Sequence, residues 1–205
     1  MKLAFIIDPL ERLDPGHDST VAMMEAAQQL GHEVFVTAVS DLSVINGQAW
    51  AKLAPLTLNP VELVNGHWQV THPWYEVGTS QWQNLTTCQA VFMRKDPPVT
   101  VPYLYATFIL ELLAPTSTLV INSPQGLREA NEKMYTLQFA SVMPETVVSL
   151  DKGLIRQFVD RHQEAILKPL GGKAGEGILF LADGDRNFNS LIEVCLLYTS
   201  PSPRD

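Results

Sequence analysis

The sequence predicts an α/β protein in which a domain built on a parallel sheet is followed by a smaller α+β unit. Residues 1–39 follow a strand–helix–strand pattern, which gives parallel strands when the links are short. A later apolar run ends in the charged, proline-rich segment 94–98. A glycine-rich stretch between two apolar runs, at 165–180, predicts a hairpin in the second unit.

The opening begins with a continuous apolar run over Lys2–Ile7, typical of a buried parallel strand. Asp18 or Ser19 can cap a helix over Thr20–Leu30, whose apolar residues recur at helical spacing. The next strand is predicted over Glu33–Val39.

The stretch 41–89 predicts small antiparallel strands that decorate this sheet. Asn65-Gly66 between two alternating segments indicates a hairpin, and Ile45–Gln48 indicates another turn. Its large aromatic residues are interpreted as packing residues rather than as a stacking platform: Trp74, Tyr75 and Trp82.

A strand over Gln89–Met93 leads into a charged corner made of Arg94, Lys95, Asp96, Pro97 and Pro98. The prolines fix φ and stiffen the corner, which could still be a plain solvated turn. Ligands of α/β sheets bind beyond the carboxyl ends of the strands, and that edge also carries Asp8, Asp18 and Ser19. Arg94 is suited to a bidentate contact with a substrate carboxylate.

The rest of the chain alternates helical and strand patterns, with a domain boundary predicted near 123–126. A helix over Val101–Leu113 has Tyr105, Ile109 and Leu112 on one side. The further predicted elements are a strand over Thr118–Asn122, a helix opened by Ser123-Pro124, a helix at Ala130–Phe139 containing Lys133, a strand over Met143–Ser149, and helices over Leu150–His162 and about Arg186–Val194.

The glycine-rich hairpin is the strongest candidate for a phosphate site. Its loop follows Lys168 and contains Gly171, Gly172, Lys173, Gly175 and Gly177. Glycines let successive backbone N–H groups form a concave anion site, so the lysines and loop together suit a polyphosphate. A long hairpin turn without a ligand is the alternative. The loop lacks the Ser or Thr of a P-loop, and the strand that follows excludes a Rossmann fingerprint.

Composition narrows the class of protein. The chain has 205 residues and a net charge of −8, which argues against a nucleic-acid binder. No apolar stretch has the length of a membrane span, and the first residues lack a signal peptide's pattern, so a cytoplasmic location is expected. Cys88 and Cys195 fit no disulfide framework or zinc pattern.

Taken in order, these motifs resemble the bacterial glutathione synthetases, which are ATP-grasp carboxylate–amine ligases. The resemblance covers roughly residues 1–194, and its most specific segment is Met93–Pro98. The other matching segments are Asp8-Pro9, Asp18-Ser19, Ile45–Gly47, Tyr105–Thr107, Asn122–Pro124, Leu127–Lys133, Pro144–Thr146 and Ile166–Leu170.

The resemblance implies a pre-ATP-grasp substrate domain at 1–124 and the small lobe of an ATP-grasp domain at 125–194. ATP would lie between this lobe and a large lobe. Lys133 and Lys168 would bind its phosphates, and the glycine loop of Gly171, Gly172, Lys173, Gly175 and Gly177 would close over them as a mobile lid. The implied substrate-binding residues are Arg94, Asp18, Ser19 and Asp96.

The implied reaction joins γ-glutamylcysteine to glycine with ATP and Mg²⁺. The cysteinyl carboxylate attacks the γ-phosphate to give an acyl phosphate, and the amine of glycine then displaces phosphate. The magnesium ligands would lie in the large lobe, so no metal ligand is assigned in this chain. A homo-oligomer is implied for the full-length protein.

The large lobe is expected to be missing. Residues 195–205 do not match the family and are interpreted as a non-native tail, so the chain alone is expected to be inactive. Two alternatives stay open: another ATP-grasp ligase acting on a peptide or glutamate, and a non-catalytic ATP-binding fragment.

Overall fold

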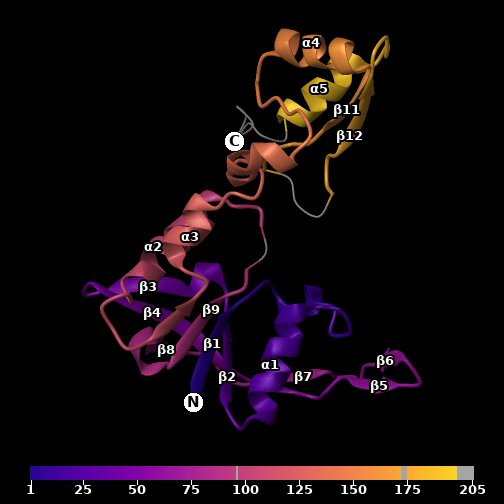
Figure 1. Cartoon of the computed structure of the whole chain (residues 1–205). Helices are drawn as coiled ribbons and strands as arrows, with labels where there is room; N and C mark the ends of the chain where they lie inside the picture. The colour runs from indigo at the N-terminus through magenta and orange to yellow at the C-terminus, as the bar shows by residue number, and fades with distance from the viewer. Residues whose placement is uncertain (96, 172–174, 198–205) are drawn as a thin grey trace. The chain divides into compact units, whose positions relative to one another are not determined.

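A computed structural model describes the chain except for residues 96, 172–174 and 198–205 (Figure 1). The described residues fall into two compact units. Unit 1 comprises Met1–Asp96 and Thr100–Ala130, and unit 2 comprises Pro97–Val99 and the residues from Asn131 onward. Helix α3 (Pro124–Glu129) belongs to unit 1 because it packs against α2 (Val101–Glu111).

Unit 1 is built on a mixed sheet with the strand order β10-β9-β1-β2-β4-β3, and β7 and β8 also pair with β4. The first four of these strands are parallel, as the strand–helix–strand opening predicts, whereas β4 runs antiparallel to β2. The strands are β1 Lys2–Ile6, β2 Glu33–Thr37, β3 Leu42–Ile45, β4 Gln48–Leu58, β7 Tyr75–Val77, β8 Gln81–Asn84, β9 Ala90–Met93 and β10 Leu119–Ile121.

The antiparallel part is larger than predicted, because β4 is one long strand. Its first half pairs with β3 and β8, and its second half pairs with β2 and β7. The predicted hairpin turns are confirmed. Asn46-Gly47 joins β3 to β4, and Asn65-Gly66 joins β5 (Glu62–Val64) to β6 (His67–Gln69), all four residues having positive φ.

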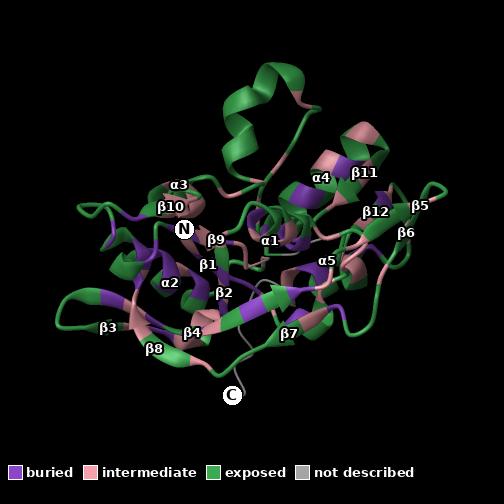
Figure 2. Cartoon of the chain, turned by 90° about the horizontal axis from the view of Figure 1, so that it is seen from below, coloured by how far each residue is buried: buried purple, intermediate pink, exposed green. Residues whose placement is uncertain are grey.

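Two helices cover opposite faces of the sheet (Figure 2). Alternate residues of β1 belong to the two cores on these faces. Leu3 and Phe5 pack with the buried residues of α1 (Ser19–Gln29), while Ala4 and Ile6 pack with those of α2. The Asp18 side chain caps α1 by accepting a hydrogen bond of 2.6 Å from the backbone N–H of Thr20.

The predicted apolar side of α2 is not its buried side. The residues that face the core are Tyr103, Ala106, Thr107 and Leu110, whereas Tyr105 is 64% exposed. Periodicity cannot choose the inner face here, because almost every position of this helix is apolar.

Unit 2 contains the predicted hairpin of β11 (Glu164–Leu167) and β12 (Leu179–Ala182), with Ile166 opposite Phe180. Helices α4 (Lys152–His162) and α5 (Phe188–Leu197) pack on it. The side chains of this core are Ile155, Val159, Leu181, Phe188 and Ile192.

Two predictions for unit 2 are wrong. A 3₁₀ helix over Tyr135–Val142, interrupted by the non-helical Phe139, stands where an α-helix was predicted, and Lys133 precedes it in a turn. Residues 143–149 form no strand: β11 and β12 pair only with each other in the described chain, and Pro144 lacks an N–H for a ladder.

Candidate functional site

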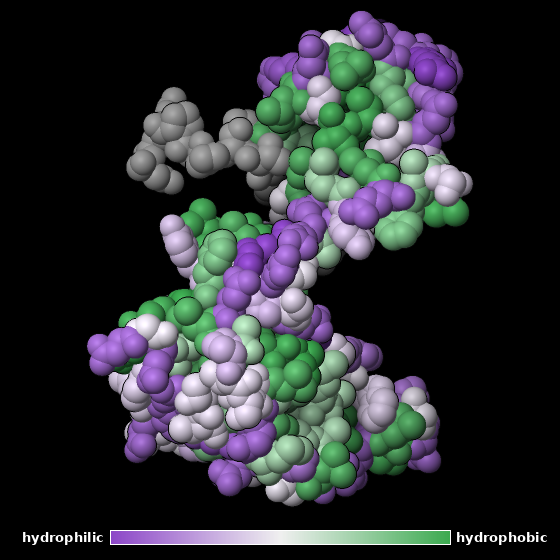
Figure 3. All heavy atoms as spheres, turned by 60° about the vertical axis from the view of Figure 1, so that its left-hand side comes forward, coloured by the Kyte–Doolittle hydropathy of each residue, from purple (hydrophilic) through white to green (hydrophobic). Residues whose placement is uncertain are grey.

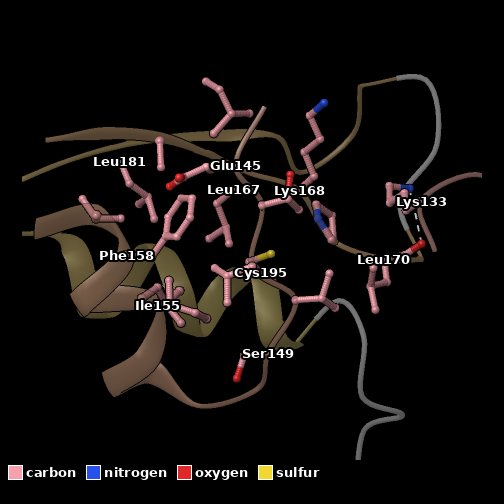
Figure 4. A pocket seen from close by; sticks show the side chains of 18 of the residues that line it. Lys133, Glu145, Ser149, Ile155, Phe158, Leu167, Lys168, Leu170, Leu181 and Cys195 are labelled. Atoms are coloured by element: carbon pink, nitrogen blue, oxygen red, sulfur yellow. Dashed lines mark hydrogen bonds between the residues drawn. The ribbon is translucent and has the colours of Figure 1, made fainter. Parts of the chain in front are cut away.

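Unit 2 holds a pocket of about 1030 Å³, bordered by α4, α5, the hairpin and segment 143–150 (Figure 4). Most of its walls are apolar, and hydrophobic residues gather on the exposed face of unit 2 with hydrophilic residues around them (Figure 3). Lys133 and Lys168 both line this pocket, although they lie on different elements.

Lys133 is held beside the start of the glycine loop. The Asn131 carboxamide accepts hydrogen bonds from the backbone N–H groups of Lys133 and Met134, at 3.1 and 3.0 Å, and so shapes the turn. The Lys133 Nζ donates to the carbonyl of Leu170 at 3.3 Å (Figure 4). It also donates to Glu132 Oε1 at 2.8 Å. This ammonium therefore lies at the mouth of the hairpin loop.

Lys168 directly follows β11, which sets its position at the end of the strand. Its side chain is exposed, and among the interactions of the described residues it has no ion-pair partner. Pro169 beside it is buried. The structure thus brings the two lysines predicted to bind phosphate to one pocket.

The glycine loop is described in part. Gly175 and Gly177 have φ values of +84° and +69°, which favour glycine. A Cβ at Gly177 would also lie 2.9 Å from Pro169 Cγ, so the loop passes closely over the residue next to Lys168. Gly171 is described, but Gly172 and Lys173 lie outside the described residues, and closure of the loop as a lid stays a prediction.

A carboxylate and an imidazole that sequence reasoning did not select also line the pocket. His162 Nε2 lies 2.8 Å from Glu145 Oε2, and Arg161 Nη2 lies 3.5 Å from Glu145 Oε1. The position of Glu145 in the family-like segment Pro144–Thr146 was the one feature of the sequence that could have drawn attention to this pair. The sequence around Glu145 does not indicate that its side chain contacts the end of α4.

In unit 1, the structure brings together three of the four predicted substrate-binding residues. Arg94 Nη2 donates to Ser19 Oγ at 2.9 Å, and Arg94 Nε donates to Thr20 Oγ1 at 3.2 Å. Asp18 caps the same helix end. Thr20 was missed, because it reads as an ordinary helical residue. Asp96 lies outside the described residues.

The neighbouring Lys95 has a different partner. Its Nζ lies 2.9 Å from Asp8 Oδ1, which joins the carboxyl ends of β9 and β1. Both residues line a smaller pocket of about 300 Å³ together with Ser40, Thr100 and Tyr103. The predicted polar edge of the sheet therefore carries two neighbouring cations, Arg94 and Lys95, each held by different partners.

The described residues contain no group of three His, Cys, Asp or Glu side chains able to hold a metal ion. None of the described helices is long and apolar enough to cross a membrane. Burial raises the pKa of the Cys88 and Cys195 thiols, so neither is activated as a nucleophile.

Two protein-family models match this chain. The family model of the prokaryotic glutathione synthetase N-terminal domain matches residues 1–128, and that of its ATP-grasp domain matches residues 132–201. The chain belongs to the prokaryotic glutathione synthetase family. The resemblance inferred from the motifs is thereby confirmed.

Individual relatives agree with this assignment. The chain is 81% identical over 194 residues to the glutathione synthetase of Synechocystis sp. (strain ATCC 27184 / PCC 6803 / Kazusa), covering 95% of this chain and 61% of that protein. It is 60% identical over 194 residues to the glutathione synthetase of Thermosynechococcus vestitus, with the same coverage of 95% and 61%. The chain thus spans about 61% of the length of these relatives.

Among solved structures, the chain is similar to the ATP-grasp ligase PsnB complexed with precursor peptide PsnA2 and AMPPNP. The TM-score is 0.50 at 14% sequence identity, and the match covers 94% of this chain and 61% of PsnB. At this identity the likeness concerns the fold alone. It supports the predicted α/β architecture with part of an ATP-grasp domain.

Proposed function

We propose that this chain is the part of a glutathione synthase that binds γ-glutamylcysteine and the phosphates of ATP. The observation that carries the proposal is the meeting of Lys133 and Lys168 at one pocket, beside the start of a glycine loop, in a chain of this family. Unit 1 would correspond to the substrate domain predicted at 1–124, and unit 2 to the small lobe predicted at 125–194.

The reaction proposed for the full-length protein has two steps. The cysteinyl carboxylate attacks the γ-phosphorus and ADP leaves, giving an acyl phosphate. The amine of glycine then attacks the acyl carbon, phosphate leaves, and the amine loses a proton. Phosphoryl transfer depends mainly on positioned positive charge, which Lys133 and Lys168 would supply.

The glycine loop would protect the acyl phosphate, because water would otherwise hydrolyse it. Gly171, Gly175 and Gly177, with Gly172 and Lys173, would place backbone N–H groups over the phosphates. Magnesium would neutralise phosphate charge, but the described residues do not form a site for it. No step is therefore assigned to a metal held by this chain.

Unit 1 would hold the dipeptide. Arg94 is fixed by Ser19 and Thr20, and its guanidinium can form a charge-assisted pair with a carboxylate. Asp18 and Asp96 are proposed as further substrate-binding residues; an ammonium group is the partner that their charge suits.

Nucleotide binding tests the lysines directly. Lys133→Met and Lys168→Met should each weaken ATP binding to the chain by roughly 10- to 150-fold, since a charged hydrogen bond contributes roughly 1.5–3 kcal/mol. Isothermal titration calorimetry measures this effect. Lys152→Met is the matched control, because Lys152 lies in unit 2 but pairs with Glu193 at 2.6 Å. Equal affinities in all three variants would refute the phosphate role.

Substrate identity needs a complete catalytic domain. A chimera that joins residues 1–194 to the remaining part of the Synechocystis glutathione synthetase should release phosphate only with ATP, γ-glutamylcysteine and glycine together. Arg94→Ala in the chimera should raise the KM for γ-glutamylcysteine far more than that for ATP. Preference for a different carboxylate substrate would reassign the chain to another ATP-grasp activity.

A further inference from the structure

Arg94 is held at two points of unit 1. Its backbone N–H donates to the carbonyl of Ile6 at 2.8 Å, which continues the pairing of β9 with β1. Its side chain reaches the first turn of α1, where Nε donates to Thr20 Oγ1 and Nη2 donates to Ser19 Oγ. The sheet therefore fixes the backbone of this half-buried residue, and the helix fixes its guanidinium.

The acceptors that hold the guanidinium are neutral hydroxyl groups. Within the part of the chain that the structure describes, Arg94 has no ion-pair partner. The neighbouring Lys95, in contrast, lies 2.9 Å from a carboxylate oxygen of Asp8. Hydroxyl oxygens orient a cation without cancelling its charge, so Arg94 rather than Lys95 offers its charge to a ligand.

The N-terminus of α1 adds positive charge beside Arg94. The first N–H groups of a helix carry partial positive charge, so a cation next to them is unfavourable. The first turn of α1 contains no acidic residue, and the Asp18 cap accepts from the Thr20 N–H without pairing with Arg94. Arrangements that break such a local rule are expected at functional sites. An anionic ligand is the partner that this position suits.

The two hydroxyl groups occupy one edge of the guanidinium. Nε and Nη2 lie on the same side of this planar group, and each donates to one of the hydroxyls, at 3.2 and 2.9 Å. Nη1 makes no hydrogen bond to any residue that the structure describes. The Nη1–Nη2 edge is therefore the one that can meet both oxygens of a carboxylate.

Thr20 is the stronger of the two anchors. Its side chain belongs to a residue that is 4% exposed, whereas Ser19 is exposed. Water can take the place of the Ser19 hydroxyl. The buried position of Thr20 excludes water, so removal of Thr20 Oγ1 would leave the Arg94 Nε–H without an acceptor.

We propose that Thr20 is a positioning residue for substrate binding, which acts through Arg94 by presenting the Nη1–Nη2 edge to a carboxylate of the ligand. The inference rests on the proposed function, which makes this carboxylate a part of γ-glutamylcysteine. A long side chain that is fixed before the ligand arrives has less freedom to lose on binding. This saving corresponds to a roughly two- to tenfold gain in affinity.

Calorimetric titration of the 205-residue chain tests the proposal. Thr20→Val keeps the shape of the buried side chain and removes the acceptor, so it should weaken binding of γ-glutamylcysteine about two- to tenfold and leave ATP binding unchanged. Thr20→Ser keeps a hydroxyl group and should restore the affinity. In an Arg94→Ala background, Thr20→Val should have no further effect, because its action passes through Arg94.

Thr107→Val is the matched control. Thr107 is also a buried threonine on a helix of unit 1, and its Oγ1 accepts a hydrogen bond of 3.1 Å from Arg128 Nη1. This variant measures the general cost of removing such a hydroxyl group. It should leave the affinity for γ-glutamylcysteine unchanged, and circular dichroism checks that every variant folds.

Nuclear magnetic resonance of the Arg94 Nε–H tests the anchor without a ligand. A hydrogen-bonded N–H exchanges slowly with water, so the signal should be visible in the original chain, Thr20→Ser and Thr107→Val, and lost in Thr20→Val. An unchanged signal or an unchanged affinity in Thr20→Val would overturn the proposal. If the original chain binds no γ-glutamylcysteine, the proposed substrate is wrong, and the Nε–H signal still decides whether Thr20 holds Arg94.

Discussion

At the scale of single residues, two polar side chains of α1 tie the helix to the last residue of β4 and to the segment that follows it. Gln28 exchanges two hydrogen bonds with the backbone of Leu58, at 2.7 and 2.8 Å, and so continues the pairing of the strand. One turn earlier, Glu25 Oε1 accepts a hydrogen bond of 2.9 Å from the Val61 N–H. Burial raises the pKa of Glu25 more than this hydrogen bond lowers it.

The Glu25 carboxylate should therefore reduce stability at neutral pH. A raised folded pKa means that the native state holds its proton longer than the unfolded state, so unfolding free energy falls as pH rises from about 4 through the folded pKa. Glu25→Gln keeps an oxygen that can accept from Val61 and removes the charge. We expect its Tm to equal or exceed that of the original chain at pH 7, with the difference shrinking toward pH 4.

Thermal unfolding at a series of pH values measures this difference. Gln29→Glu is a suitable control, because Gln29 is exposed on the same helix and should show little pH-dependent difference. If the original chain instead gains stability over Glu25→Gln as pH rises, the hydrogen bond to Val61 outweighs the cost of burying the charge.

At the scale of elements, the hairpin of unit 2 depends on a close approach between its loop and its first strand. Gly177 combines a φ of +69° with a position where a Cβ would lie 2.9 Å from Pro169 Cγ. Gly171, in the same loop, has open space around the position of a Cβ. The two glycines therefore have different structural roles, although both belong to the same sequence motif.

Gly177→Ala should destabilise unit 2 by about 1–2 kcal/mol, the cost of a left-handed conformation for a residue with a Cβ. It should also weaken ATP binding, because Pro169 must shift and Lys168 is attached to it. Gly171→Ala should change stability by less than about 0.5 kcal/mol. Denaturant unfolding and calorimetric titration of both variants provide the comparison, and equal effects would argue against the Pro169 contact.

At the scale of the whole chain, the two units have separate cores. The buried clusters of unit 1 draw on its sheet, α1 and α2, while that of unit 2 draws on α4, α5 and the hairpin. Separate hydrophobic cores favour separate unfolding, since none of the three clusters contains residues of both units.

We expect differential scanning calorimetry of the chain to show two transitions. ATP should raise the Tm of the transition that belongs to unit 2. At a concentration about one hundred times its dissociation constant, ATP should add about 2.7 kcal/mol to the free energy of unfolding of that unit. γ-Glutamylcysteine should raise the Tm of the transition that belongs to unit 1. A single transition, or equal shifts of both by ATP, would show that the units unfold together or that ATP binds elsewhere.

The sequence by itself determined the elements whose cause is local. The strand–helix–strand order, capping by Asp18 and the Asn-Gly pairs predict the parallel opening and the hairpins, because these signals act within short segments. The motifs also sufficed to indicate the family, as the family models confirm.

Only the tertiary structure decided which strands pair, which side of a helix is buried and which distant residues are in contact. It divides β4 between two sets of neighbours, leaves 143–149 unpaired, and chooses Tyr103 rather than Tyr105 as the inner side of α2. It also brings Lys133 to Leu170, which lies 37 residues away. Contacts of this kind depend on how segments far apart in the sequence pack together. A local sequence pattern does not specify which of several apolar segments becomes buried or which strands pair.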